Sequence, residues 1–129
     1  MVPAVPPTPG LSAQVVLVVT DADPATALRT GAVPVLATPR LIALCEEASV
    51  LALEGALSGG QTSVGGRVQF DHLAPVGVGS TVTADATLER VEGRRLTFTV
   101  STSDASGLVG AGRMSRVVVD LDTFMAKAR

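Results

Sequence analysis

The chain has 129 residues, of which 47% are hydrophobic and 17% are charged, and its formal net charge is -2. This is the composition of a globular protein, long enough to bury roughly two thirds of its unfolded surface, and it predicts one domain over residues 1–129. A slightly negative chain without Trp or Tyr, and with three Phe, offers neither a basic nor an aromatic surface for nucleic acid.

The cysteine count and the N-terminal segment bear on the compartment. Cys45 is the only cysteine, so no intrachain disulfide can form, and we expect a cytoplasmic protein. Residues 1–10 are proline-rich and carry no basic side chain, which predicts a flexible lead-in and not a signal peptide. No apolar run reaches about 18 residues without a charge, so we expect no membrane partner.

The first half of the chain predicts a strand, a loop and a long helix. Residues 12–20 are rich in β-branched side chains and predict a strand. Residues 21–34 predict a loop with one helical turn. Thr38 followed by Pro39 is typical of a helix start, with Thr38 at the N-cap and Pro39 at the first helical position. The helix is expected over 40–57, and because it is apolar on nearly every face we expect it to be buried.

The second half changes to the alternating pattern of strands. Four strands are predicted near residues 62–72, 80–91, 95–105 and 108–119. Turn residues at 91–94 and 104–107 predict hairpins, and residues 121–129 a short helix. One strand, a buried helix and four strands form the α+β hotdog arrangement: a curved antiparallel sheet of about five strands wrapped around one helix. The open sheet edges favour a dimer.

Three side chains carry groups used in acyl transfer or hydrolysis. His72 is the only histidine and ends an alternating stretch. Glu46 lies within the apolar helix, but Glu47 has equally apolar neighbours, so periodicity does not choose between them. For Thr38, the helix-capping role explains the residue without any chemistry.

Other candidates are assigned structural roles. Asp71 is expected to point to the opposite side of its strand from His72. Cys45 is interpreted as a small apolar filler in the helix. One His and one Cys cannot assemble the usual zinc ligand sets, so we expect no metal.

Three segments resemble the fluoroacetyl-CoA thioesterase-like branch of the hotdog thioesterases. They are VLATPRLIALCEEA (35–48), VGGRVQFDHLAP (64–75) and VEGRRL (91–96). The resemblance implies that Thr38, Glu46 and His72 form the catalytic set and that Gly65 lies beside the thioester. It also implies a homodimer with its site at the subunit boundary. Arg116 matches an arginine of the family pattern. Two roles remain open for it: a structural ion pair or a contact with a CoA phosphate.

The function implied by the resemblance is hydrolysis of a short-chain acyl-CoA to the free acid and CoA, without a cofactor. His72 would act as general base or acid. Glu46 would orient the histidine or attack the thioester, and Thr38 would bond the carboxylate or act as nucleophile. Two alternatives are a non-catalytic acyl-CoA-binding hotdog dimer and a hotdog enoyl-CoA hydratase.

Overall fold

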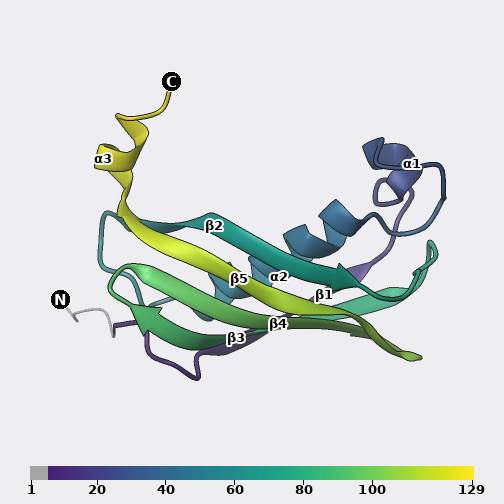
Figure 1. Cartoon of the computed structure of the whole chain (residues 1–129), viewed down its shortest axis with the longest axis horizontal. Coiled ribbons are helices and arrows are strands. Elements are labelled where there is room, and N and C mark those ends of the chain that lie inside the picture. The colour runs from purple at the N-terminus through teal and green to yellow at the C-terminus, as the bar shows by residue number, and fades with distance from the viewer. Residues whose placement is uncertain (1–5) are drawn as a thin grey trace.

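The computed structural model describes residues 6–129, and its largest element is a five-stranded antiparallel sheet (Figure 1). The strands are β1 (Ser12–Val18), β2 (Gln61–His72), β3 (Thr81–Glu92), β4 (Arg95–Asp104) and β5 (Gly107–Asp120), in the order β1-β3-β4-β5-β2. The helices are α1 (Ala25–Leu28), α2 (Thr38–Ala52) and α3 (Leu121–Met125). The predicted strands, the helical turn in the 21–34 loop and the short C-terminal helix are confirmed. Residues 1–5 of the predicted lead-in lie outside the described part.

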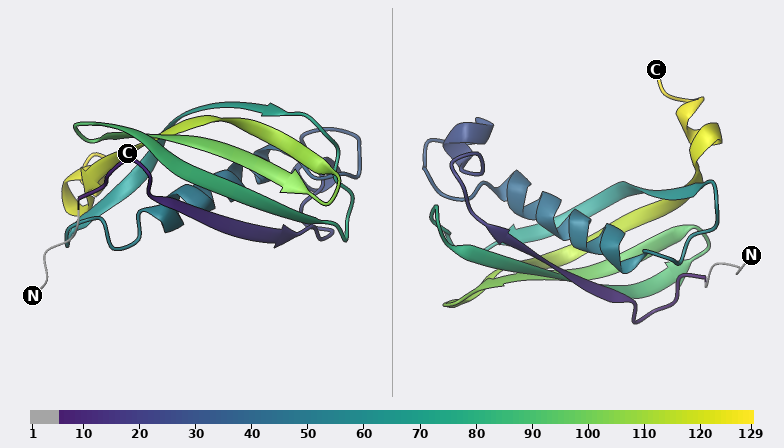
Figure 2. Two further views of the ribbon diagram at one scale, coloured as in Figure 1. Left: turned by 90° about the horizontal axis from the view of Figure 1, so that it is seen from below. Right: turned by 180° about the vertical axis from the view of Figure 1, so that it is seen from behind.

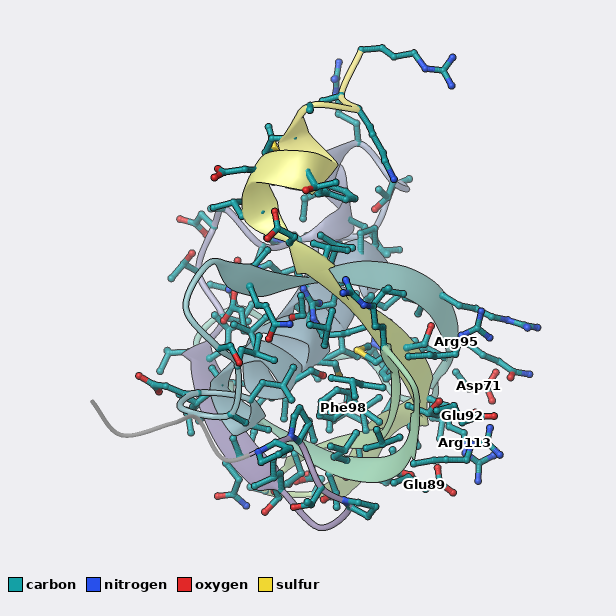
Figure 3. All side chains as sticks on the ribbon, turned by 90° about the vertical axis from the view of Figure 1, so that its left-hand side faces the viewer. Asp71, Glu89, Glu92, Arg95, Phe98 and Arg113 are labelled. Carbon is teal, nitrogen blue, oxygen red and sulfur yellow. The ribbon has the colours of Figure 1, made fainter. Side chains whose placement is uncertain are left out.

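The core lies between α2 and the sheet. Figure 2 shows α2 lying against the concave face of the sheet. Every second residue of β3 from Val82 to Leu88 is buried, as expected for a strand with one face on a core. The helix contributes buried aliphatic side chains, among them Leu41 and Leu44. Figure 3 shows Phe98 on this inner side, whereas Asp71, Glu89, Glu92, Arg95 and Arg113 project from the outer side.

A bulge in β2 decides which of its side chains face α2. The register against β5 shifts between Gly65 and Arg67. In a regular strand, residues seven positions apart, such as Gly65 and His72, would point to opposite faces. The extra residue of the bulge turns Gly65 and His72 to the same face. Gly65 pairs with Arg116 and His72 pairs with Gly110, and Arg116 and Gly110 are both buried on the α2 side of β5.

The helix α2 differs from its prediction in three respects. Its N-cap is Ala37, without a side-chain hydrogen bond, so the expected capping by Thr38 is wrong. It ends at Ala52 and not at residue 57, because the amides of Leu53 and Glu54 bond to carbonyls three residues earlier, at 3.1 Å each. It is also not buried on every side, since it covers the sheet with one face only, leaving Val50 50% exposed.

The two hairpins form where the turn residues predicted them. Glu92 pairs with Arg95, and Gly93 between them has φ 60°, which favours glycine. Asp104 pairs with Gly107, and its carboxylate accepts the amides of Ser106 and Gly107. In the described part of the chain, no helix has the length and apolar character needed to cross a membrane.

Candidate active site

Thr38 and His72 are in direct contact. The hydroxyl of Thr38 lies 2.7 Å from Nδ1 of His72, and Nε2 of His72 lies 2.9 Å from the carbonyl oxygen of Ala74. The first residue of α2 therefore meets the last residue of β2. Thr38 is exposed and His72 is half-buried, so a substrate can reach the pair.

The hydrogen bonds of the ring determine where its proton is. A carbonyl oxygen only accepts, so the neutral His72 ring donates from Nε2 to Ala74. Its Nδ1 is then free of hydrogen and accepts from the Thr38 hydroxyl. This is the geometry of a nucleophile bonded to a base that a third group orients, with a backbone carbonyl in the third position.

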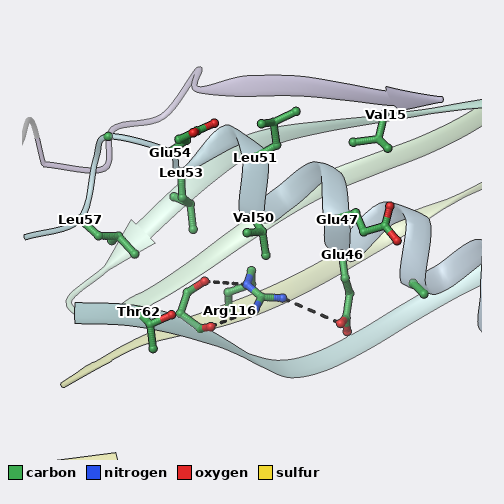
Figure 4. Close-up of a pocket in the computed structure, with 13 residues that line it drawn as sticks. Val15, Glu46, Glu47, Val50, Leu51, Leu53, Glu54, Leu57, Thr62 and Arg116 are labelled. Carbon is green, nitrogen blue, oxygen red and sulfur yellow. Dashed lines mark hydrogen bonds and ion pairs between the residues drawn. The ribbon is translucent and has the colours of Figure 1, made fainter. Parts of the chain in front are cut away.

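Glu46, Gly65 and Arg116 form a second cluster on the same face of β2. Figure 4 shows Glu46 facing Arg116. A Cβ atom at Gly65 would lie 3.2 Å from Oε1 of Glu46 and 3.8 Å from Nη1 of Arg116. Nη1 of Arg116 lies 3.9 Å from Oε2 of Glu46, which is an ion pair but too long for a hydrogen bond. The Glu46 side chain is 41% exposed, so its carboxylate remains open to a ligand or water. Gly65 leaves the space into which this carboxylate projects.

Two hydrogen bonds to Ser63 hold the guanidinium of Arg116 in place. Its Nε donates to the Ser63 hydroxyl at 2.8 Å, and its Nη2 donates to the Ser63 carbonyl at 3.0 Å. The Arg116 side chain is 8% exposed. Burial lowers the pKa of its guanidinium, and the Glu46 charge offsets part of this effect. Sequence reasoning missed Ser63; its only signal is its place two residues before Gly65, on the same side of the strand.

The two clusters do not meet within one chain. Glu46 follows Thr38 by eight residues, which is about 12 Å along a helix axis. Among the described residues, Glu46 has no hydrogen bond or ion pair to Thr38 or His72. The structure thus brings Thr38 together with His72, and Glu46 together with Gly65 and Arg116.

The neighbouring candidates take other roles. Glu47 is directed to Arg40, at 3.4 Å, which separates it from Glu46 where periodicity did not. Asp71 projects from the outer side of the sheet (Figure 3), as expected. Cys45 is fully buried, and burial, with a smaller effect of the Glu46 charge, raises the pKa of its thiol to about 12. Its thiol is therefore protonated at neutral pH and unsuited to nucleophilic attack.

Each cluster opens into its own cavity. The cavity beside Thr38 and His72 has a volume of about 460 Å³ and is bounded by residues of the 25–39 segment and of the 72–75 turn. The cavity beside Glu46 and Arg116 has a volume of about 890 Å³ and runs between α2 and the start of β2 (Figure 4). In the portion of the chain that is described, no three His, Cys, Asp or Glu side chains are grouped so that they could hold a metal.

Comparison with known proteins gives a consistent result. A family described as fluoroacetyl-CoA-specific thioesterase (FlK) matches residues 19–122. The fluoroacetyl-CoA thioesterase of Streptantibioticus cattleyicolor is 40% identical over 95 residues, which cover 74% of this chain and 68% of that protein.

Two solved structures of FlK superpose on nearly the whole chain. The fluoroacetyl-CoA thioesterase FlK has a TM-score of 0.88 and 33% identity, with 94% of each chain covered. A variant of FlK in complex with fluoroacetate and CoA has a TM-score of 0.85 and 32% identity, with 92% of this chain and 99% of that chain covered. Fold and sequence therefore agree that this hotdog-fold chain belongs to the FlK family of thioesterases.

Proposed function

We propose that this protein hydrolyses short-chain acyl-CoA thioesters as a homodimer, with Glu46 of one protomer acting beside Thr38 and His72 of the other. The observation that carries the proposal is the division of the three groups into two clusters at opposite ends of one exposed strand segment. Family membership supports the reaction class, since the curated relative is a thioesterase. Water and the chain's own side chains suffice for the reaction, so it is written without a cofactor.

The free edge of β2 is the surface that supports the dimer. β2 is the last strand of the sheet, and residues 65–69 in its middle are all exposed. Unpaired backbone groups along such an edge favour pairing with another strand. Val50 on the uncovered face of α2 is also exposed and would be covered by a second helix. Two-fold symmetry requires the two β2 strands to pair antiparallel.

Antiparallel pairing explains why the two clusters lie where they do. Opposed residues of an antiparallel pair share a face, so a two-fold axis at Gln69, which pairs this residue with its own copy, is allowed. It places the bulge at Gly65 and Gly66 of one protomer opposite the partner's His72. Glu46, which touches Gly65, then faces the partner's Thr38 and His72. The dimer would contain two such sites, each with one hydroxyl, one imidazole and one carboxylate.

In this proposal each group has a role, which the contact between Thr38 and His72 supports. Thr38 attacks the thioester carbonyl and transfers its proton to Nδ1 of His72, which passes it to the departing CoA thiolate. Water then attacks the threonine ester and gives a proton to the Glu46 carboxylate. The bond between the acyl carbon and Oγ breaks as Glu46 returns this proton to the Thr38 oxygen, which releases the acid and restores all three groups. In the first turn of α2, as far as the chain is described, the amides of Thr38 and Arg40 have no hydrogen-bond partner, and they are suited to bind the oxyanion.

Arg116 and Gly65 support the carboxylate in this proposal. Arg116 is anchored on Ser63 and positions Glu46, while Gly65 leaves room for Glu46 and for the thioester. A direct contact of either residue with substrate stays a prediction. We also place the reaction in the cytoplasm, because a single cysteine cannot form an intrachain disulfide; fractionation of cells expressing the protein checks this.

Subunit complementation tests the proposal. Glu46→Ala and His72→Ala should each lower thiol release from acyl-CoAs by at least about 100-fold. When the two variants are co-expressed, random pairing makes about half of the dimers mixed, and each mixed dimer has one intact site. Activity should recover to about a quarter of wild type.

Each alternative predicts a different result in the same assay. If all three groups acted within one chain, every site would keep one defect and no activity would return. An acyl-CoA-binding dimer without catalysis would bind CoA esters and release no thiol from any of them. An enoyl-CoA hydratase would add water to an enoyl-CoA and leave its thioester intact.

A further inference from the structure

We infer that the acyl group of the substrate is a neutral aliphatic chain longer than acetyl, bound in the cavity beside Thr38 and His72. The inference rests on the proposed function and specifies its substrate class. Four observations carry it: the lining of this cavity, its size, its lack of a cationic side chain, and the contrast with the cavity beside Glu46.

The lining beside the reactive pair is aliphatic. Side chains of Ala25, Val33, Val35, Leu73 and Pro75 form its walls. Val33 and Leu73 at its rim are 56% and 59% exposed. Apolar side chains left in water beside a hydrolytic pair favour an apolar ligand, because binding removes them from water.

The cavity is larger than a two-carbon acyl group needs. Its volume is about 460 Å³. A water molecule occupies about 30 Å³ of liquid, so an acetyl group with three heavy atoms would fill roughly a fifth of this space. A longer chain would contact the walls and remove more apolar surface from water, which stabilises its complex.

The cavity offers no partner for a charged acyl group. Within one protomer, Thr30, Thr38 and His72 are its polar side chains, and no Asp, Glu, Lys or Arg lines it. In the proposed dimer the partner's Glu46 adds a carboxylate to this site, which repels an acyl chain that ends in a carboxylate. A carboxylate at the end of a malonyl or succinyl chain would be desolvated there without a cation. The nearby guanidinium of Arg40 is already paired with Asp23 at 3.2 Å and Glu47 at 3.4 Å.

The other cavity is less suited to the same chain. Glu46, Glu47, Glu54 and Arg116 all line it, so an aliphatic group placed there would meet four charged side chains. Burying apolar surface against them would cost part of their hydration. The division of charge between the two cavities therefore assigns the acyl chain to the Thr38–His72 side.

A panel of substrates tests the inference, with kcat/KM measured for acetyl-, fluoroacetyl-, butyryl-, hexanoyl- and succinyl-CoA. Each rate is divided by the alkaline hydrolysis rate of the same thioester, which removes differences in intrinsic reactivity. Each buried methylene should raise kcat/KM about fourfold, so butyryl-CoA should exceed acetyl-CoA about 15-fold. Succinyl-CoA should fall at least about tenfold below butyryl-CoA.

Opposite rankings would overturn the inference while leaving the proposed function intact. These are a corrected value for acetyl- or fluoroacetyl-CoA that equals or exceeds that for butyryl-CoA, or a value for succinyl-CoA that matches butyryl-CoA. Absence of turnover on every member of the panel would overturn the proposed function itself, and the inference with it.

A matched pair of variants tests whether the acyl chain lies in the cavity beside Thr38 and His72. Val33→Phe fills the cavity and should lower kcat/KM for hexanoyl-CoA at least about tenfold while changing acetyl-CoA less than about threefold. Val16→Phe is the control, because Val16 is 60% exposed and lines neither cavity. Val33→Ala, which enlarges the cavity, should move the preference to longer chains.

Equal loss on both substrates in Val33→Phe would show that this cavity does not hold the acyl chain. Dissociation of the Val33→Phe dimer in size-exclusion chromatography with light scattering would show that Val33 is a subunit contact, and would also overturn the inference. A circular dichroism melt of each variant verifies that it is folded.

Discussion

Replacing Gly65 with alanine should impair catalysis without destabilising the fold. The added Cβ would lie 3.2 Å from Oε1 of Glu46 and 3.7 Å from its Cδ. This is tighter than an ordinary contact, so the carboxylate must move by a few tenths of an ångström. Because a misplacement of about 1 Å can cost 100-fold in rate, we expect kcat/KM to fall roughly tenfold.

Gly66→Ala is a closely matched control. A Cβ at Gly66 would lie 3.2 Å from Oγ of Ser115, the same distance, but at a position where it does not approach Glu46. Neither glycine has a positive φ, so alanine is not strained at either position and reduces the entropy of the unfolded chain. Both variants should melt within about 5 °C of wild type.

The assay is thiol release under kcat/KM conditions, with the oligomeric state of each variant measured beside it. Gly66→Ala should retain activity within about twofold of wild type, because its added Cβ meets the Ser115 hydroxyl and leaves the Glu46 carboxylate in place. Equal activity in the two alanine variants would refute the reasoning, since only Gly65 lies against the carboxylate. Rescue of Gly65→Ala by shortening Glu46 to Asp would support it further.

Three further predictions concern other side chains. Thr38→Val should lower kcat at least about 100-fold while Thr38→Ser retains most of it, and incubation with substrate should leave mass-detectable acyl groups on residue 38. Cys45, with its thiol pKa raised to about 12, should resist iodoacetamide at pH 8 in the folded protein, and labelling without unfolding would contradict this. Burial raises the pKa of Asp23, but hydrogen bonds from Thr20 and Arg40 outweigh it and lower the pKa below 3.8. Asp23→Asn should therefore cost about 1–2 kcal/mol of unfolding free energy at pH 7. In urea unfolding this difference should shrink as the pH falls through the lowered pKa, and a constant difference would contradict the assignment.

Local patterns were sufficient for the architecture. The alternation in β3 and β4 and the turn residues around Gly93 and Gly107 placed the strands within one or two residues. They succeed because side-chain period and turn conformation depend on a few neighbouring residues. The end of α2 was placed five residues too late because residues 53–57 continue the run of Leu, Glu and Ala, which favours a helix. Such composition does not distinguish a last helical turn from the tighter turns that replace it.

The active-site residues illustrate a different limit. Glu46 and Glu47 have equivalent neighbours in the sequence, and only the position of α2 on the sheet directs one to Gly65 and the other to Arg40. Thr38 has the residue type of a helix cap, but its hydroxyl bonds His72, which lies 34 residues away in the chain. Ser63 has no distinguishing pattern, because its role depends on the buried guanidinium of Arg116 on the adjacent strand.

The sequence by itself determined the elements, their order, the family and the residue types from which a site can be built. Tertiary structure decided how these residues are grouped. The bulge at Gly66 turns Gly65 and His72 to the same face of β2, and the direction of α2 across the sheet holds Glu46 away from Thr38 and His72. Both outcomes arise from contacts between segments distant in sequence, where a shift of one residue in register reverses every side chain.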